Sequence, residues 1–335
     1  MVLPDTKYYL ELSMINTDPS QGRQISAKLL QQRISYCVTV ARIVLCLFGT
    51  ILTIVQIVKF FTLAPDERGF TSLLIAFVLG ILCLILSFPP LINNIITKFA
   101  SHIRSRSLAI YSYIFPIIIG IALFLIKNGM DQDSWRRVSS EGGVSEYGTA
   151  IAYLLISVFA YPIFKQFWRR NQKFLAVAYL LLVVASFVVA MEEISWGQRL
   201  IGFDEPQFWA EHNDQSEFNF HNLSFYNKNI LNQSFVVIGF LGSLSWIVLN
   251  YWQKRGQSRR LDLSYILPNW SISSFFYPTF VFYFLYLHPR GMRFVVPYDQ
   301  EHCEFIMSLG ILLFVTLNFF RQAIEDDRAN RYLSQ

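Results

Sequence analysis

Charged residues are scarce in this chain, and it has no cysteine arrangement of known chemistry. Only 15% of its 335 residues are charged, whereas 53% are hydrophobic and fall in long uninterrupted blocks. A soluble domain of this length needs more polar surface, so the composition excludes an ordinary globular protein and indicates a hydrocarbon environment. The four cysteines include no CxxC pair, and three of them lie inside apolar blocks, so no disulfide framework is predicted.

The chain also lacks a concentrated basic patch, although its formal net charge is +5. Its lysines and arginines flank the apolar blocks instead of gathering on one segment. This distribution is typical of membrane proteins, because their cytoplasmic loops keep positive charge. A nucleic-acid partner is therefore rejected, and the lipid bilayer is the expected surrounding.

Eight apolar blocks each meet the length of roughly 20 residues that a membrane-spanning helix needs. They predict an all-α fold, a polytopic transmembrane helix bundle of about eight spans. Pro89 and Pro90 are expected to end the second helix, because proline cannot continue one. The seventh block carries several polar residues, but its aromatic second half favours a membrane location. The predicted spans are residues 36–62, 70–91, 108–126, 146–164, 174–192, 230–251, 267–287 and 303–321.

The connections between these blocks alternate in charge, which predicts their orientation. The second, fourth and sixth connections are basic, whereas the odd connections carry most of the acids. Basic loops stay in the cytoplasm, so both termini are predicted to be cytoplasmic, in a bacterial inner membrane or a thylakoid-type membrane. The predicted parts are a cytoplasmic tail at 1–33, one transmembrane domain at 34–322 with an outer loop at 199–229, and a cytoplasmic tail at 323–335.

Two adjacent carboxylates at the end of the fifth span are the most informative feature of the sequence. Glu192 and Glu193 lie at or just inside the predicted outer interface, where an ionised acid needs a partner or a water-filled pocket. If the helix continues, one of its faces carries Glu192, Ser195, Trp196 and Arg199, and Glu193 points about 100° away. The alternative is that the helix ends here, with solvated acids and Trp196 in the interfacial aromatic belt.

Other predicted outer helix ends repeat this pattern of carboxylates. Glu146 opens the fourth span, and Glu301 and Glu304 open the eighth beside His302. Three helices would then bring carboxylates to one depth, in a pocket that suits general acid/base chemistry or a divalent cation. The predicted catalytic residues are Glu146, Glu192, Glu193 and Glu304.

The predicted outer loop interleaves aromatic residues with side chains that can ligate a metal or form hydrogen bonds. Residues 204–206 predict a turn into a short interfacial helix at 207–210, either a lid or an ordinary anchored loop. Glu217 and His221 are four residues apart, which suits metal ligation, yet no HExxH or HxxxH motif is present and a hydrogen-bonded loop cap explains them equally well. The predicted ligands of a divalent metal are Glu217, His212, His221 and His302, and the predicted substrate contacts are Trp196, Gln198, Arg199, Asn219 and Asn222.

A resemblance rests on residues 192–203, EEISWGQRLIGF, and on the polar residues that follow up to Asn222. This stretch is similar to a group of bacterial polytopic membrane proteins that carry an EEISWGQR segment before an outer loop. The resemblance covers residues 192–222 specifically, and the helices match only in general character. It implies that this segment is the functional one, and it implies no substrate.

Three classes of function stay open at this stage. The first is a membrane-embedded enzyme with an extracytoplasmic site for a lipid or lipid-linked substrate, in which Glu192 or Glu193 is the general base. The second is an accessory or assembly subunit of a larger membrane complex, which needs a membrane-protein partner and no reactive site. The third is a transporter, which would favour charged groups near the midplane and broken helices, and both are scarce in the sequence.

Overall fold

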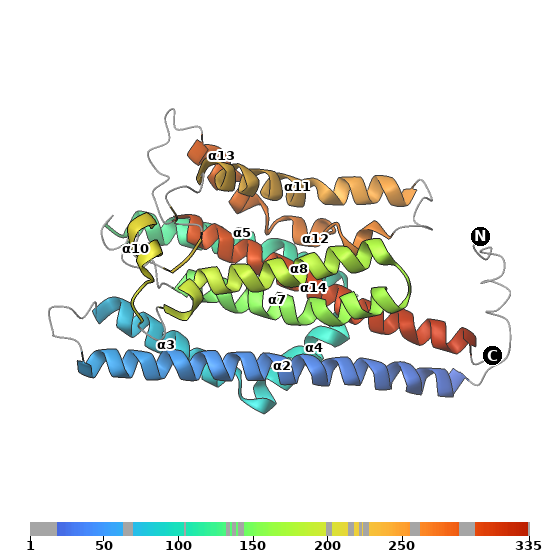
Figure 1. Ribbon diagram of the computed structural model, residues 1–335. Coiled ribbons are helices and arrows are strands. Elements are labelled where there is room, and N and C mark those ends of the chain that lie inside the picture. The colour runs from blue at the N-terminus through green and yellow to red at the C-terminus, as the bar shows by residue number, and fades with distance from the viewer. Residues whose placement is uncertain are drawn as a thin grey trace.

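The described part of the chain is a bundle of helices that lie roughly side by side (Figure 1). The start of α2 and the end of α14 lie at one end of the bundle, the terminal end, and the short helix α10 lies at the other, the α10 end. The described residues contain no β-strand. The computed structural model describes residues 19–62, 70–103, 105–131, 135, 139, 144–198, 203–213, 218–220, 223, 228–254, 262–287 and 299–333.

Six described helices are long and apolar enough to cross a membrane, or seven spans if one bent pair is counted as a span. The all-α prediction and the multi-pass prediction are thereby confirmed for the described residues. The count of eight spans and the cytoplasmic placement of both termini stay predictions. The six helices are α2 (Pro19–Thr62), α5 (Arg106–Gly129), α7 (Val144–Arg169), α8 (Lys173–Glu193), α11 (Lys228–Lys254) and α14 (Asp299–Leu333).

The predicted second span is a bent pair of helices, α3 (Phe70–Leu86) and α4 (Pro89–His102). Their axes differ by 70° across a break of a few residues. Pro89 and Pro90 occupy the first positions of α4, where a residue without a backbone N–H is tolerated, so the prolines end one helix and start the next. The expectation that they terminate the second helix is confirmed.

The predicted seventh span is broken, so the expectation of one continuous helix over 267–287 was wrong. It consists of α12 (Trp270–Ser273) and α13 (Tyr277–Leu287), and α13 alone has 11 residues. The side chain of Asn269 caps α12 by accepting a hydrogen bond from the Ser271 backbone N–H at 3.1 Å. Asparagine and serine side chains form hydrogen bonds with nearby backbone groups and so compete with a regular helix. Pro278 lies in the first turn of α13, where a missing backbone N–H is tolerated. The pairs α3/α4 and α12/α13 are therefore two broken segments among the described residues. The sequence had indicated that broken helices are scarce.

Both predicted tails are partly helical. α2 begins at Pro19, within the predicted N-terminal tail at 1–33, and its membrane-crossing stretch is Leu30–Thr62. α14 extends to Leu333, within the predicted tail at 323–335. The two helices therefore continue beyond the apolar windows from which the tails were inferred.

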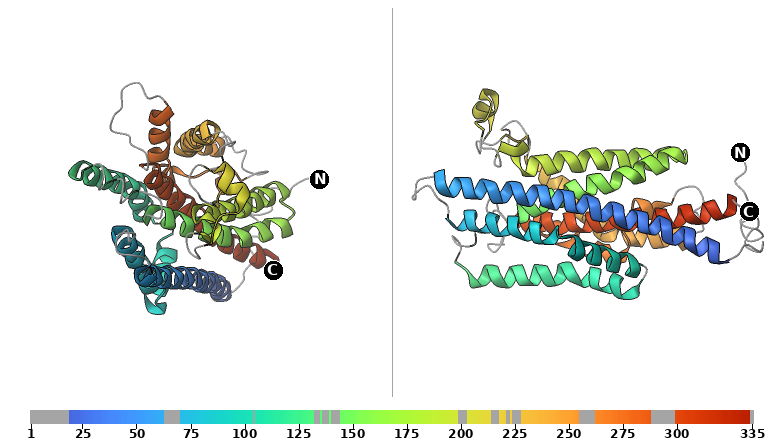
Figure 2. Two further views of the ribbon diagram at one scale, coloured as in Figure 1. Left: turned by 60° about the vertical axis from the view of Figure 1, so that its left-hand side comes forward. Right: turned by 90° about the horizontal axis from the view of Figure 1, so that it is seen from below.

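α7 lies at the centre of the bundle and α5 at its edge (Figure 2). Of the apolar window of α7, 61% is buried inside the protein, against 6% for α5. Gly148 allows α7 to approach α14 closely, because a Cβ at this position would lie 2.6 Å from the Phe305 ring. The central pair α7 and α14 therefore positions the polar residues at the α10 end.

Candidate functional site

The polypeptide reverses direction directly after α8. Ser195, Trp196 and Gly197 have φ angles of 46°, 52° and 88°, which lie in the left-handed region. Non-glycine residues rarely adopt this region, and it costs roughly 1–3 kcal/mol where the surroundings impose it. Of the two alternatives for this segment, the structure shows the one in which the helix ends, because α8 stops at Glu193, so the continuous helical face with Ser195 and Trp196 was wrong. Arg199 lies outside the described residues.

Glu192 ties this turn to the outer loop. The indole Nε1 of Trp196 donates to its Oε1 at 2.5 Å, and the backbone N of Phe220 donates to its Oε2 at 2.8 Å. The side-chain oxygen of Gln198 accepts a hydrogen bond from the backbone N of Phe218 at 2.5 Å. Charge-assisted bonds to a carboxylate are stronger than neutral ones, so Glu192 holds the turn and the loop together.

The loop itself is organised by α10 (Gln207–His212), which confirms the predicted short helix. The indole of Trp209 donates to the backbone carbonyl of Asn219 at 3.1 Å, and the amide of Asn213 donates to the Asn219 side chain at 3.3 Å. Asn219 is only 1% exposed. The Trp209 ring also contacts the Phe218 ring, with 4.7 Å between centroids. Asn219 therefore stabilises the loop from within.

A buried cluster surrounds His302 in the first turn of α14. The hydroxyl of Ser145 lies 2.5 Å from Nδ1, and that of Ser139 lies 2.9 Å from Nε2. The ring of Trp135 contacts the imidazole, with 5.1 Å between centroids. Both ring nitrogens thus have a hydroxyl partner, so neither is left for a metal ion in this arrangement.

An ion pair adjoins this cluster. Lys127, at the end of α5, pairs with Asp299, the first residue of α14, and the two side chains are 20% and 15% exposed. The indole of Trp135 donates to the other oxygen of Asp299 at 2.9 Å. Glu146, 8% exposed, follows Ser145 in the first turn of α7. Helices α5, α7 and α14 therefore share one polar network at the α10 end.

A second set of residues, the acid–tyrosine group, comprises Glu193, Glu304, Tyr153 and Tyr283. The hydroxyl of Tyr283 on α13 donates to the carboxylate of Glu304 on α14. Tyr153 on α7 is close enough to interact electrostatically with both Glu304 and Glu193. Four helices, α7, α8, α13 and α14, thus bring two carboxylates and two phenols together.

The predicted site residues divide into separate places. Glu193 and Glu304 belong to the acid–tyrosine group, whereas Glu192 belongs to the turn after α8. His212 lies on α10, and its Nδ1 is 2.9 Å from the carbonyl oxygen of Phe208. His302 lies on a different helix, α14. No group of three His, Cys, Asp or Glu side chains among the described residues is placed to hold a metal ion. The predicted residues Glu217, His221 and Asn222 lie outside the described residues.

Several residues of these clusters escaped the sequence analysis. Tyr153 lies seven residues after Glu146, so both belong to the same face of α7, and this spacing was a usable signal. Lys127 was the one base at the end of an otherwise apolar stretch. Tyr283 stands in an aromatic run and carries no distinguishing signal.

Comparisons with known proteins assign no function to this chain. No protein-family model, curated protein or solved structure matches the chain. The resemblance of residues 192–222 brings no activity with it. The long apolar helices nevertheless indicate a multi-pass integral membrane protein.

Proposed function

We propose that this protein is a membrane-embedded enzyme that acts on the polar head of a lipid or lipid-linked substrate at the extracytoplasmic interface. The observation that carries the proposal is the acid–tyrosine group, in which Glu304 accepts a hydrogen bond from Tyr283. Glu304 and Glu193, on different helices, both lie within electrostatic range of Tyr153. Acids within membrane helices are costly, even by insertion scales that assign about 2.5–3.5 kcal/mol at the bilayer centre. A lone acid at a helix end is explained by solvation, but a group assembled from four helices favours a site for chemistry.

The two carboxylates suit a division of roles in group transfer or hydrolysis. One carboxylate, as the base, removes the proton from a water or hydroxyl nucleophile while that oxygen attacks the substrate. The other, as the acid, gives a proton to the leaving oxygen, so that charge balances over the reaction. Tyr153 and Tyr283 would orient the reacting oxygens, since a phenol both donates and accepts a hydrogen bond. We assign the base to Glu193 and the acid to Glu304. In its protonated form Glu304 can accept the Tyr283 hydroxyl on its carbonyl oxygen while its own O–H is kept for the leaving oxygen.

The neighbouring features have supporting roles in this proposal. Glu192 positions the loop together with Trp196, Gln198 and Asn219, so the loop is held against the turn that follows α8. Glu146 supports the first turn of α7 beside the His302 cluster. The charge alternation of the loops predicts that this end faces out of the cytoplasm.

The test uses protein reconstituted in nanodiscs that contain a total lipid extract from bacteria, with lipid conversion followed by mass spectrometry. Wild type is expected to convert one lipid class, and Glu193→Gln and Glu304→Gln are each expected to lower the rate by about 10²–10⁴-fold. The matched control is Glu211→Gln, which changes the same charge at an exposed position of α10. Retention of the wild-type rate in Glu193→Gln or Glu304→Gln, or no conversion by wild type, contradicts the proposal and favours an accessory subunit.

Glu192→Gln separates positioning from catalysis. An amide cannot accept from both Trp196 and Phe220, so we expect faster hydrogen exchange at the Phe220 amide. The rate of conversion should fall by less than about tenfold, because the loop is loosened while Glu193 keeps its place. A loss as large as that of Glu193→Gln would assign the base to Glu192 instead.

A transporter is the second candidate, and the two broken segments favour it. The breaks between α3 and α4 and between α12 and α13 are of the kind that carries substrate in several transporter folds. Flux of a lipid head group across liposomes, without any covalent change in the lipid, would support this candidate over the enzyme.

A further inference from the structure

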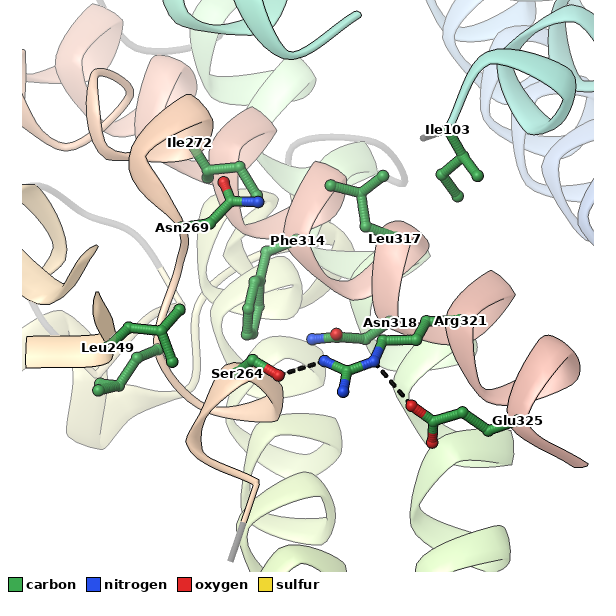
Figure 3. Close-up of a pocket in the computed structure, with 11 residues that line it drawn as sticks. Ile103, Leu249, Ser264, Asn269, Ile272, Phe314, Leu317, Asn318, Arg321 and Glu325 are labelled. Carbon is green, nitrogen blue, oxygen red and sulfur yellow. Dashed lines mark hydrogen bonds and ion pairs between the residues drawn. The ribbon is translucent and has the colours of Figure 1, made fainter. Parts of the chain in front are cut away.

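A cavity of about 420 Å³ lies near the terminal end of the bundle, away from the acid–tyrosine group (Figure 3). Its volume is in the range of small-molecule sites in proteins. Arg321, which lines it, follows Glu304 by 17 residues on α14, which corresponds to about 25 Å along the helix axis. The cavity is therefore a different place from the proposed catalytic site, and an inference about it does not depend on that proposal.

One side of the cavity is apolar. Leu249 of α11, Ile272 of α12, and Phe314 and Leu317 of α14 line it. Water gains no hydrogen bonds from such a wall, and well-ordered water needs two to four polar partners. In a protein surrounded by lipid, a hydrocarbon chain is the natural occupant of this part of the cavity.

The other side carries a buried acceptor. Asn318 is 4% exposed, lines the cavity, and donates from Nδ2 to the hydroxyl of Tyr179 at 2.9 Å. The Asn318 amide is therefore a polar group in the cavity wall that the bond to Tyr179 holds in place. A ligand with an N–H donor can use the side-chain oxygen of Asn318 as an acceptor.

The polar rim carries charges of both signs in equal number. Arg321 donates to Asp262 and to Ser264, and its Nε donates to Glu325 at 2.8 Å, as the close-up shows for Ser264 and Glu325 (Figure 3). Arg170 lies 3.8 Å from the other oxygen of Glu325. Arg321 and Glu325 line the cavity. Asp262 and Arg170 pair with them from beside it, so the charges of the two signs balance. The side chains of Arg321, Asp262 and Glu325 are 34–38% exposed, so a ligand can reach them.

This charge pattern selects among lipid heads. An anionic head would satisfy Arg321 but would face the two carboxylates, and like charges repel. A zwitterionic head can form an ion pair with each sign of charge. Its phosphate would pair with the guanidinium, and its cation would pair with the carboxylates. The carboxylate of Glu325 and the amide oxygen of Asn318 can accept further hydrogen bonds from N–H donors, which a primary ammonium has and a quaternary ammonium lacks.

We propose that this cavity binds one membrane phospholipid with an ethanolamine head. Its phosphate accepts hydrogen bonds from Arg321, its ammonium donates to Glu325 and Asn318, and one acyl chain lies against Phe314 and Leu317. The lipid seals the gap between α11, α12 and α14. It is a bound component of the protein and is left chemically unchanged.

The test is native mass spectrometry of the protein released from detergent after addition of phosphatidylethanolamine, phosphatidylcholine or phosphatidylglycerol of identical chains. Wild type is expected to retain one phosphatidylethanolamine and to bind it at least tenfold more tightly than either of the other two lipids. Leu317→Trp fills the apolar side, and Arg321→Gln removes the phosphate partner, so each is expected to weaken retention at least tenfold. The control Leu241→Trp adds the same volume at a position of α11 that is 60% exposed, and it should bind as wild type does.

Glu304→Gln is the control that separates this inference from the proposed enzyme, because it removes the proposed acid and should leave lipid retention unchanged. Equal retention of the three lipids by wild type overturns the inference, since it indicates general contact with lipid. Retention at the wild-type level by either Leu317→Trp or Arg321→Gln overturns it as well. The two substitutions alter different sides of the cavity, so one variant is sufficient if the other folds poorly.

Discussion

The two ends of α14 hold their polar residues in opposite ways. In the first turn, His302 is 9% exposed and both of its ring nitrogens have hydroxyl partners from elsewhere in the chain. Toward the other end, Arg321 shares its guanidinium between Asp262 and Glu325, and these side chains are about one-third exposed. One helix therefore carries a buried, specific network at the α10 end and an accessible ion-pair network at the terminal end.

This difference shows what each network contributes. A buried group that loses its partner keeps its desolvation cost, so the His302 network depends on every member. Exposed ion pairs contribute little to stability because water and salt screen them, so their partners can be exchanged for a ligand. The α10 end therefore holds its polar residues in one geometry. The ion pairs at the terminal end can exchange a partner for a ligand.

His302→Ala should have the largest effect on stability. It leaves Ser139 and Ser145 buried without their partner, at about 1–3 kcal/mol each, and it opens a cavity beside Trp135. We expect a loss of about 3 kcal/mol in the free energy of unfolding, followed by tryptophan fluorescence in detergent. His102→Ala, at an exposed histidine of α4, is the control and should change it by less than about 0.5 kcal/mol. Similar losses in both variants would remove the distinction between buried and exposed networks.

The same change of aspartate to asparagine compares the two networks directly. Asp299→Asn breaks a mostly buried pair with Lys127 and should cost about 2–3 kcal/mol. Asp262→Asn breaks a pair with Arg321 that is 34% and 38% exposed, and should cost at most about 1 kcal/mol. Asparagine preserves the cap that Asp262 provides to Ser264, so the comparison isolates the charge. Unfolding of both variants under one detergent condition measures the difference, and a reversed order would contradict it.

Much of the fold could be predicted from the sequence, because hydrocarbon surroundings impose a simple rule on segment length and polarity. The rule located the six long helices, and prolines located the break before α4. It failed at 267–287, where Asn269 caps the start of α12, Ser273 donates to the Trp270 carbonyl, and the helix is interrupted before Tyr277. Polar side chains here compete with a regular helix for backbone hydrogen bonds. Counting the apolar residues in a window takes no account of side chains that form hydrogen bonds with the backbone.

The candidate site could be predicted only in part, for a related reason. Glu193 and Glu304 were identified because acids in a membrane helix are costly and need a reason. The left-handed turn at Ser195 and Trp196 could not be foreseen, since neither residue favours that region. One of the two bonds to Glu192 that stabilise it comes from Phe220, which is 28 residues away along the chain. Tyr153 and Tyr283 are two among 17 tyrosines, and only the packing of four helices distinguishes them.

A smaller effect, confined to alkaline pH, is expected at the terminal end. Tyr265 there is 3% exposed, and its hydroxyl donates to Glu325 at 2.7 Å. Burial, together with the Glu325 carboxylate, raises the pKa of Tyr265 above its ordinary value near 10. The folded protein therefore keeps this proton at pH values where the unfolded chain has lost it, and this contribution to stability falls as the pH rises above about 10.

Tyr265→Phe removes that contribution. Between pH 9 and pH 11, wild type should lose about 1 kcal/mol more of its free energy of unfolding than Tyr265→Phe does, because each pKa unit corresponds to about 1.4 kcal/mol. Tyr111→Phe, at a tyrosine that is 69% exposed, should follow the wild-type curve. If Tyr265→Phe also follows that curve, the phenol ionises as freely in the folded protein as in the unfolded chain. The terminal end would then be open throughout, and the difference between the two ends of α14 would be larger than the structure indicates.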